Sequence, residues 1–126
     1  MGLVHADICL SNPKAPELEK MRVDALVDTE AVTLCVPEHV AVQLKLEEIE
    51  QREVTTADGK LHVVSYVGPV QVNFHKRTCF TGAFVLGDAV LMGAVPMEDM
   101  DLVIEPARQR VTVNPQSPNI PSAIVK

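Results

Sequence analysis

The stretch ALVDTEAV, from Ala25 to Val32, places an ionisable side chain at the end of an apolar run. A lone carboxylate such as that of Asp28 needs hydrogen-bond donors there, or else it takes up a proton. Thr29 adds a hydroxyl that can cap or cross-link a tight loop, and the small Ala31 lets the chain turn back into the core. The pattern indicates either a rigid loop that presents an acid–base aspartate or an acidic surface turn between two strands.

The composition of the chain favours one small domain that is rich in β-structure. Its 126 residues suit a single domain over 1–126, and 47% of them are hydrophobic, which is enough to form a core. Aromatic residues make up only 3%, whereas valine is frequent and occurs in short runs that favour strands. We therefore expect an all-β fold with an aliphatic core.

Charge and hydrophobicity argue against two kinds of partner. The formal net charge is −6, and the sequence has no cluster of Lys or Arg and few aromatic residues, so we expect no nucleic-acid partner. No apolar run reaches the length of a membrane span, and the first ten residues, MGLVHADICL, lack the pattern of a signal peptide. We therefore expect no membrane partner either.

The cysteines indicate the compartment. Cys9, Cys35 and Cys79 are odd in number and far apart, and neither they nor the scattered histidines show a metal-binding spacing. This suits buried thiols in a reducing, cytoplasmic environment. We expect no metal site and no cofactor.

Local patterns predict where the chain turns. A short helix is expected from about Glu38 to Leu44, because Pro37 can open a helix and Glu38 suits its positive end. Asp58-Gly59 lies between two β-rich arms and predicts a hairpin with a two-residue type I′ turn. Lys76-Arg77 predicts a further turn, and the closing residues SAIVK indicate a terminal strand.

Two segments of the chain are similar to each other. LCVPEHV (Leu34–Val40) and GAVPMEDM (Gly93–Met100) both pass from an apolar strand through Val-Pro into an acidic short helix. Two structurally similar halves of one domain would produce this echo. Chance would also produce it, because valine and proline are common in this sequence.

The segment ALVDTEA resembles the Asp-Thr-Gly-Ala loop of the retropepsin-like aspartic proteases, in their bacterial-type single-domain form. The second signature of that family is an apolar pair followed by glycine and a short helix. Val90–Val113, VLMGAVPMEDMDLVIEPARQRVTV, is similar to it, with Met97–Met100 as the helix and 106–109 as the turn of a closing hairpin. The order of the segments also matches, and the resemblance covers about Ala6–Val113.

This resemblance implies a closed acid-protease barrel with a flap hairpin and one or two short helices. It assigns Asp28 as the catalytic residue and places three groups of residues around it. The catalytic loop is supported by Thr29, Glu30 and Ala31, the flap tip comprises Ala57, Asp58, Gly59 and Lys60, and the loop-packing residues are Leu91, Met92 and Gly93.

The family's reaction needs two aspartates, whereas Asp-Thr occurs once in this chain. The resemblance therefore implies a homodimer in which Asp28 of each chain faces the other across a two-fold axis. Two carboxylates so close cannot both ionise, so the pair shares one proton and activates a water for hydrolysis of a peptide bond. The partner would be a peptide or protein substrate with hydrophobic side chains, which Val32, Val63, Val64 and Leu91 are expected to contact.

Glu30 departs from the family pattern, which has glycine at this position. Pointing inward, two Glu30 side chains would crowd the dimer floor and repel the catalytic pair, which predicts a weak or inactive protease. Pointing outward, they would be solvated or paired with Arg22, Arg52 or Arg108, which predicts a working one. Two alternatives to a protease remain: a dimer of the same fold that binds extended peptides without cleaving them, and a structural β-domain without a ligand.

Overall fold

The structure, a computed structural model, describes residues 3–125 of the chain. Its strands in chain order are β1 (Val4–Ser11), β2 (Met21–Val27), β3 (Leu34–Val36), β4 (Glu47–Thr55), β5 (Leu61–Phe74), β6 (Arg77–Val85), β7 (Leu91–Met92), β8 (Leu102–Glu105) and β9 (Arg110–Val113). The helices of this part of the chain are α1 (Glu38–Gln43) and α2 (Ala94–Asp99). The expected all-β fold with short helices is confirmed.

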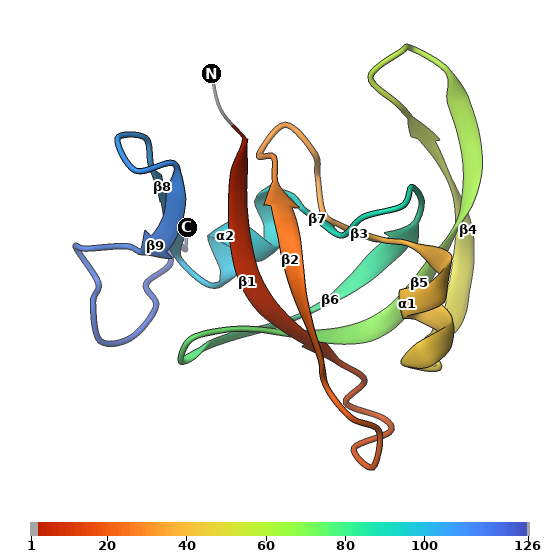
Figure 1. Cartoon of the computed structure of the whole chain (residues 1–126), viewed down its shortest axis with the longest axis horizontal. Helices are drawn as coiled ribbons and strands as arrows, with labels where there is room; N and C mark the ends of the chain where they lie inside the picture. Colours follow the sequence, from red (N-terminus) through yellow and green to blue (C-terminus); the bar gives the residue numbers. More distant parts are fainter. Residues whose placement is uncertain (1–2, 126) are drawn as a thin grey trace.

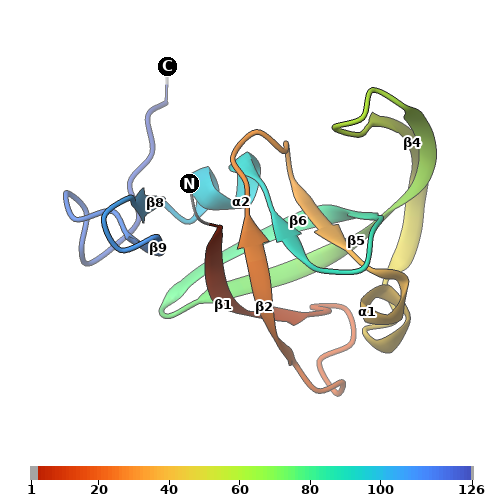
Figure 2. The ribbon, with the colours of Figure 1, turned by 45° about the horizontal axis from the view of Figure 1, so that its top comes forward.

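Six of the strands close into a barrel. Their order is β5–β6–β3–β7–β2–β1, and the ring closes where Cys9–Ser11 of β1 pairs with Gln71–Asn73 of β5. β4 continues the sheet beyond β5, while β9 and β8 continue it beyond β1. The β4–β5 hairpin and the β8–β9 hairpin therefore stand on opposite sides of the barrel (Figure 1 and Figure 2). The expected closed barrel is confirmed.

Side chains that point inward along these strands form an aliphatic core. Leu10, Leu34, Val70 and Met92 are fully buried, and Ile8 is almost so. Each such side chain stabilises the fold by about 1.5–3 kcal/mol when it leaves water. Because aromatic side chains are few, this burial of aliphatic groups is the main force that keeps the barrel closed.

The barrel contains two halves of similar construction, arranged about its central pair of strands. β7 pairs in parallel with β2, where Leu91 lies opposite Leu26, and β3 pairs in parallel with β6, where Leu34 lies opposite Ala83. β3 and β7 pair with each other in antiparallel fashion. Each helix follows closely on its inner strand, α1 on β3 and α2 on β7. The echo between the two Val-Pro segments therefore corresponds to two similar halves rather than to chance.

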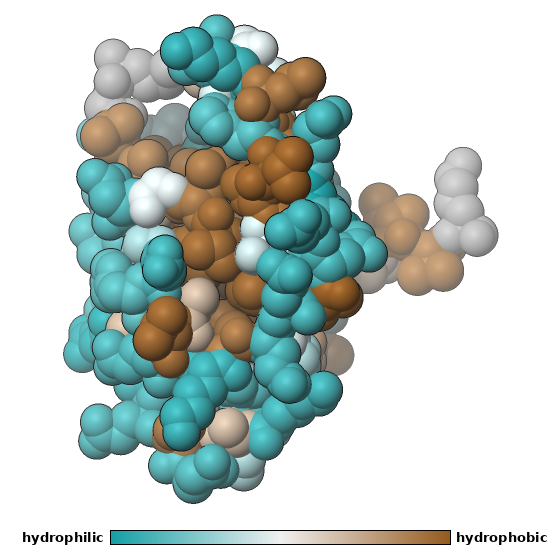
Figure 3. Space-filling view, turned by 90° about the vertical axis from the view of Figure 1, so that its right-hand side faces the viewer, coloured by the Kyte–Doolittle hydropathy of each residue, from teal (hydrophilic) through white to brown (hydrophobic). Residues whose placement is uncertain are grey.

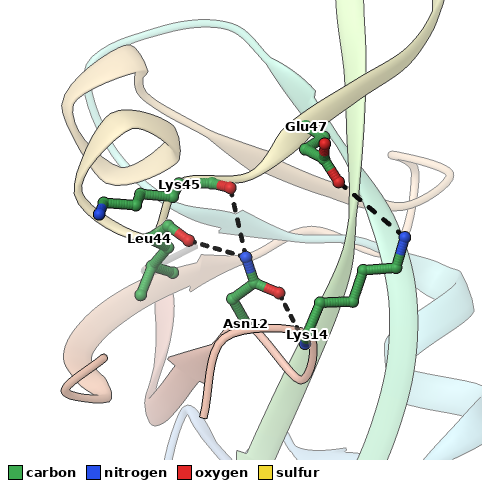
Figure 4. Close-up of polar contacts among 5 residues, drawn as sticks. All are labelled: Asn12, Lys14, Leu44, Lys45 and Glu47. Carbon is green, nitrogen blue, oxygen red and sulfur yellow. Dashed lines mark hydrogen bonds and ion pairs between the residues drawn. The ribbon is translucent and has the colours of Figure 1, made fainter. Parts of the chain in front are cut away.

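A buried asparagine fixes the end of α1, from which the chain enters β4. The side-chain amide of Asn12 donates to the carbonyl oxygens of Leu44 at 2.9 Å and Lys45 at 3.3 Å. Its side-chain oxygen accepts the N–H of Lys14 at 2.9 Å, and the Lys14 ammonium lies 3.9 Å from the carboxylate of Glu47 (Figure 4). The connector after β1 thus holds the base of the β4–β5 hairpin.

The tip of the β4–β5 hairpin, which was expected to be the flap, differs from the predicted two-residue turn. Thr56 pairs with Lys60, since its N–H donates to the Lys60 carbonyl at 3.0 Å, and the loop between them holds Ala57, Asp58 and Gly59. Gly59 has a φ of 83°, a left-handed conformation that glycine adopts freely. The Asp58 carboxylate accepts the Thr56 hydroxyl and the Lys60 N–H; these bonds lower the pKa of Asp58 and favour the longer loop.

Both helices have boundaries that differ from the prediction. α1 ends at Gln43 rather than Leu44. α2 spans Ala94–Asp99 rather than Met97–Met100. It begins earlier because its first N–H groups find carbonyl partners in the loop that follows Asp28, so the unpaired donors of its first turn are satisfied there.

The turn assigned to Lys76-Arg77 is made by His75 and Lys76 instead. Arg77 opens β6 and is buried, and its guanidinium donates to the carbonyl oxygens of Met100 at 2.9 Å and Asp101 at 3.3 Å. These bonds require Arg77 to point inward from a strand. The predicted hairpin turn at 106–109 is confirmed.

The tail lacks the strand predicted for SAIVK. Its described residues, up to 125, have no regular structure, and Lys126 lies outside the described part. Instead, one carboxylate holds the segment before it. Asp101 accepts the Ser117 hydroxyl, the side-chain amide of Asn114 at 3.1 Å and the N–H of Ser122 at 2.9 Å.

The surface is uneven on the face that carries β4 and α1, where hydrophobic side chains form a central band between hydrophilic margins (Figure 3). On these elements and on β5, Val42, Ile49, Leu61 and Val63 are each more than half exposed. In the described part of the chain, no helix is long and apolar enough to cross a membrane.

The Asp101 contacts predict an acid-sensitive tail. Hydrogen bonds from Ser117, Ser122 and Asn114 lower the pKa of Asp101 from the ordinary 3.8, so ionised Asp101 stabilises the fold above that pH. This stabilisation is lost as the pH falls through the lower folded-state value. We expect Asp101→Asn to speed amide hydrogen exchange over 114–122 at neutral pH, after correction for intrinsic rates. The wild type should show the same change as the pH falls below the lowered folded-state pKa of Asp101.

Asp99→Asn, which alters an exposed carboxylate two residues away, is the matched control and should leave exchange in the tail unchanged. Equal exchange over 114–122 in the wild type and in Asp101→Asn would contradict the role given to this carboxylate.

Candidate active site

Asp28 directly follows β2, at the end of the barrel where the β4–β5 hairpin rises (Figure 1 and Figure 2). Its N–H donates to the carbonyl of Met92 at 3.1 Å, and its own carbonyl accepts the N–H of Ala31 at 3.1 Å. One carboxylate oxygen accepts the N–H of Glu30 at 3.0 Å. The side chain is otherwise exposed. The anchored backbone and open carboxylate suit acid–base chemistry with a bound partner.

The chain around Gly93 braces this loop from behind. Gly93 donates its N–H to the carbonyl of Thr33 at 3.1 Å, and Ala94 and Val95 donate theirs to the carbonyls of Ala31 and Val32, both at 2.8 Å. A Cβ added at Gly93 would lie only 2.5 Å from the carbonyl oxygens of Ala31 and Thr33. Glycine is therefore required here by the close approach of two backbones.

The other loop residues differ in exposure. Thr29 and Glu30 are exposed, and Ala31 is half-buried. Within the described residues, the Thr29 hydroxyl forms no hydrogen bond, so the expected cap is not made in a single chain.

No cation of residues 3–125 lies within ion-pair distance of Glu30. Arg22 binds Asp7, and Arg52 binds Glu50. Of the two alternatives expected for an outward Glu30, solvated or paired with an arginine, the single chain has the solvated one.

One contact of the loop was not found by sequence reasoning. The buried Thr33 lies at the end of the loop, and its hydroxyl oxygen is 3.2 Å from that of Thr81 on β6. The contact spans 48 residues in sequence. A threonine next to an apolar strand gives no local signal of such a partner, so only the closure of the barrel identifies it.

A row of half-buried apolar residues crosses the outer face of the sheet beside Asp28. Neighbouring strands place them opposite one another in turn, from β5 to β2. This apolar stripe consists of Tyr66, Phe84, Cys35, Leu91 and Leu26. On each strand at least one adjacent residue points into the core and is buried, as expected from strand alternation: Val67, Ala83, Leu34, Met92 and Ala25. The stripe is therefore a surface on which a ligand could bury apolar side chains.

The four residues expected to contact a substrate lie on different surfaces. Leu91 belongs to it, and Val64 lies on the same face of β5 as Tyr66. Val63 points to the opposite face and is 67% exposed, because neighbouring residues of a strand alternate. Val32 is 68% exposed in the loop itself.

The tip of the β4–β5 hairpin lies at the same end of the barrel as the loop that follows β2 in both views (Figure 1 and Figure 2). Its residues Ala57, Asp58, Gly59 and Lys60 are all exposed. The Asp58 carboxylate bonds to Thr56 and Lys60 within the turn. The Asp28 loop, the stripe and the hairpin therefore meet around one open region.

Other reactive groups do not gather at this site. Burial raises the pKa of the Cys35 thiol, and it raises that of Cys79 to about 12, so both thiols stay protonated at neutral pH. In residues 3–125, no group of three or more His, Cys, Asp or Glu side chains is placed to bind a metal ion. A groove of about 570 Å³ lies along β1, with His5, Arg22 and Arg110 in its lining, and contains none of the predicted site residues.

Comparisons with known proteins support the fold. Neither the protein-family models nor the curated proteins give a match. Among solved structures, the chain is similar to the retroviral protease-like domain of Ddi1 from Leishmania major, with a TM-score of 0.56 and 12% identity over 90% of this chain and 91% of that one. The Simian foamy virus (mac) protease matches with a TM-score of 0.44 and 21% identity, over 76% of this chain and 93% of that one. The chain has the retropepsin-like fold.

The contact at Gly93 predicts a strong effect of a single added methyl group. Gly93→Ala should lower the free energy of unfolding by about 2–4 kcal/mol, because two backbone carbonyls must move away. Chemical denaturation measures the change. Gly87→Ala is the comparison, since an added Cβ there meets nothing within 4 Å and only the φ of 80° is strained. That variant should lose about 1–2 kcal/mol, and a smaller loss at Gly93 than at Gly87 would contradict the bracing role.

Proposed function

We propose that this chain is one protomer of a homodimeric aspartic endopeptidase of the retropepsin type, with Asp28 as its catalytic residue. The observation that carries this proposal is the position of the Asp28 carboxylate. The carboxylate accepts the Glu30 N–H, while the backbone N–H of Asp28 donates to the Met92 carbonyl. The carboxylate lies at one end of the apolar stripe and remains open to a partner. An acidic surface turn would need neither the stripe nor the bracing at Gly93.

The internal symmetry of the barrel supports a dimer rather than a self-sufficient chain. Leu86 donates its N–H to the carbonyl of Val36 at 3.0 Å, as Asp28 does to Met92 in the other half. The second half thus has an aliphatic residue where the first has an aspartate. A second carboxylate would come from Asp28 of another copy, across a two-fold axis. The exposed Val32 and the adjacent Val95, 68% and 45% exposed, offer apolar surface for that contact.

The proposed reaction follows from two facing carboxylates. At such a distance they share one proton. The ionised member takes a proton from a water, whose oxygen bonds to the carbonyl carbon of the scissile peptide while the protonated member donates to the carbonyl oxygen. The carbon–nitrogen bond then breaks, and the leaving amine receives a proton from the pair. An extended peptide would pair with the flap strands and place hydrophobic side chains on the stripe.

A second candidate function is peptide binding without cleavage, in a dimer of the same fold. Glu30 favours it, because a dimer would bring two additional carboxylates beside the catalytic pair. The flap, the stripe and the dimer contact would serve either function. We propose the cytoplasm as the compartment for both, since the three thiols, Cys9, Cys35 and Cys79, are all free.

Replacing the proposed catalytic carboxylate tests the reaction. Asp28→Asn keeps the size of the side chain but cannot share a proton within the pair, so peptide cleavage should fall by at least about 10³-fold, to the background rate. Cleavage of a hydrophobic peptide library, read by mass spectrometry between pH 4 and 7, measures it. Activity should be highest on the acid side of neutrality. Asp24→Asn, on the same strand, is the matched control and should keep activity.

Two results would contradict this assignment: cleavage that survives Asp28→Asn, or a chain that stays monomeric at micromolar concentration in analytical ultracentrifugation. Binding of the library without any cleavage by the wild type would favour the second candidate function.

Glu30 can be tested by separating its bulk from its charge. Glu30→Gly removes both, and we expect tighter dimerisation or faster cleavage, by about 1–3 kcal/mol. Glu30→Gln keeps the bulk and removes the charge. A gain in both variants identifies repulsion as the cause, whereas a gain in Glu30→Gly alone identifies crowding. If Glu30→Gly changes neither dimer affinity nor cleavage, the solvated side chain has no cost and this account of Glu30 is wrong.

A further inference from the structure

Arg52 is held in place on the β4–β5 hairpin by contacts with neighbouring side chains. It lies on β4 opposite Val64, and its guanidinium carbon is 3.7 Å from the centroid of the Tyr66 ring. Beneath the ring lies Gly82, where an added Cβ would be 2.1 Å from the ring carbon Cζ. The absence of a side chain at Gly82 makes room for the ring, and Arg52 covers the ring by a cation–π contact.

The orientation of the guanidinium is set from one side only. Its Nε donates to a carboxylate oxygen of Glu50 at 2.6 Å, and this ion pair raises the pKa of Arg52. Within residues 3–125, Glu50 is the partner to which the Arg52 side chain donates a hydrogen bond of normal geometry, and the side chain is 44% exposed. The Tyr66 hydroxyl is near enough to contribute to the raised pKa of Arg52, and the exposed edge of the planar fork suits a carboxylate.

This fork lies at the flap end of the apolar stripe. Tyr66 is the first residue of the stripe, and Arg52 rests on it from the same face of the hairpin. The stripe crosses four strand spacings, roughly 19 Å along a curved sheet, and an extended peptide advances about 3.4 Å per residue. A peptide bound along the stripe would thus pass Arg52 roughly five to six residues from the bond beside Asp28.

We propose that Arg52 is a specificity-determining residue that selects an acidic side chain in the bound peptide, several residues from the scissile bond. The inference rests on the proposed function, because it needs an extended peptide on the stripe. Hydrophobic side chains of the peptide would cover the stripe, and one Glu or Asp would accept two hydrogen bonds from the free edge of Arg52.

The neighbouring charges permit this contact. On the same face of the hairpin, the titratable groups beside Arg52 are Glu50, which occupies its Nε side, and His62, which lies opposite Val54. Glu48 accepts the Ser65 hydroxyl on the opposite face. β4 is rich in glutamate in the sequence, but Glu50 is the glutamate that lies beside Arg52 on the side of the hairpin that faces the stripe.

The test uses synthetic decapeptides with a hydrophobic centre and Glu, Gln or Lys at one scanned position. Binding to the Asp28→Asn variant is measured by fluorescence anisotropy, and cleavage is measured with the wild type. We expect one position at which Glu is preferred over Gln by about three- to tenfold, the range for a partly exposed charge-assisted pair. The preference should weaken as salt is added.

Variants at position 52 assign the preference. Arg52→Glu should reverse it, so that Lys is preferred over Gln at the same position. Arg52→Lys should reduce it, because an ammonium lacks the planar fork. Arg108→Glu makes the same change of net charge in the β8–β9 turn, away from the stripe, and should leave the preference unchanged.

The outcomes separate this inference from the proposed function. Peptides that bind or are cleaved with no preference for Glu at any position, or with a preference that Arg52→Glu leaves intact, overturn the role of Arg52 alone. Failure of every peptide to bind or to be cleaved overturns the proposed function, and the inference with it.

Discussion

The structure depends on the placement of β7 between β2 and β3. This short strand pairs in parallel with one and antiparallel with the other, so it joins the strand before Asp28 to the strand after the loop. Immediately beyond it, Gly93 and the first residues of α2 donate to the carbonyls of the loop. Hydrogen bonds from a segment more than sixty residues away thus fix a loop that has few contacts of its own.

This arrangement explains why the candidate site is open yet ordered. Apart from the buried Thr33 at its end, the loop needs no buried side chain, because its backbone groups are satisfied by β7 and α2. Asp28 and Glu30 can therefore both remain exposed in a single chain. Because this loop is exposed, Glu30 is important for the proposed dimer. Two copies would bring four carboxylates together, those of Asp28 and Glu30 from each chain.

The hairpin of β4 and β5 has two faces with different chemistry. One carries Arg52 on Tyr66 and continues into the apolar stripe. The other carries exposed apolar residues such as Leu61 and Val63. Because strands alternate, a sequence rich in glutamate on β4 leaves one face with the ion pair of Arg52 and Glu50. Any peptide that binds along the stripe would meet that face.

The sequence by itself determined the β-rich class, the short helices and the hairpins, because these follow from local periodicity and from residues such as Pro37 and Gly59. It also identified the Asp28 loop and the Gly93 segment. It could not give the Thr33–Thr81 contact, the burial of Arg77 or the stripe that ends at Leu26. Those depend on register between strands far apart in the chain, and only closure of the barrel decides which side chains become neighbours.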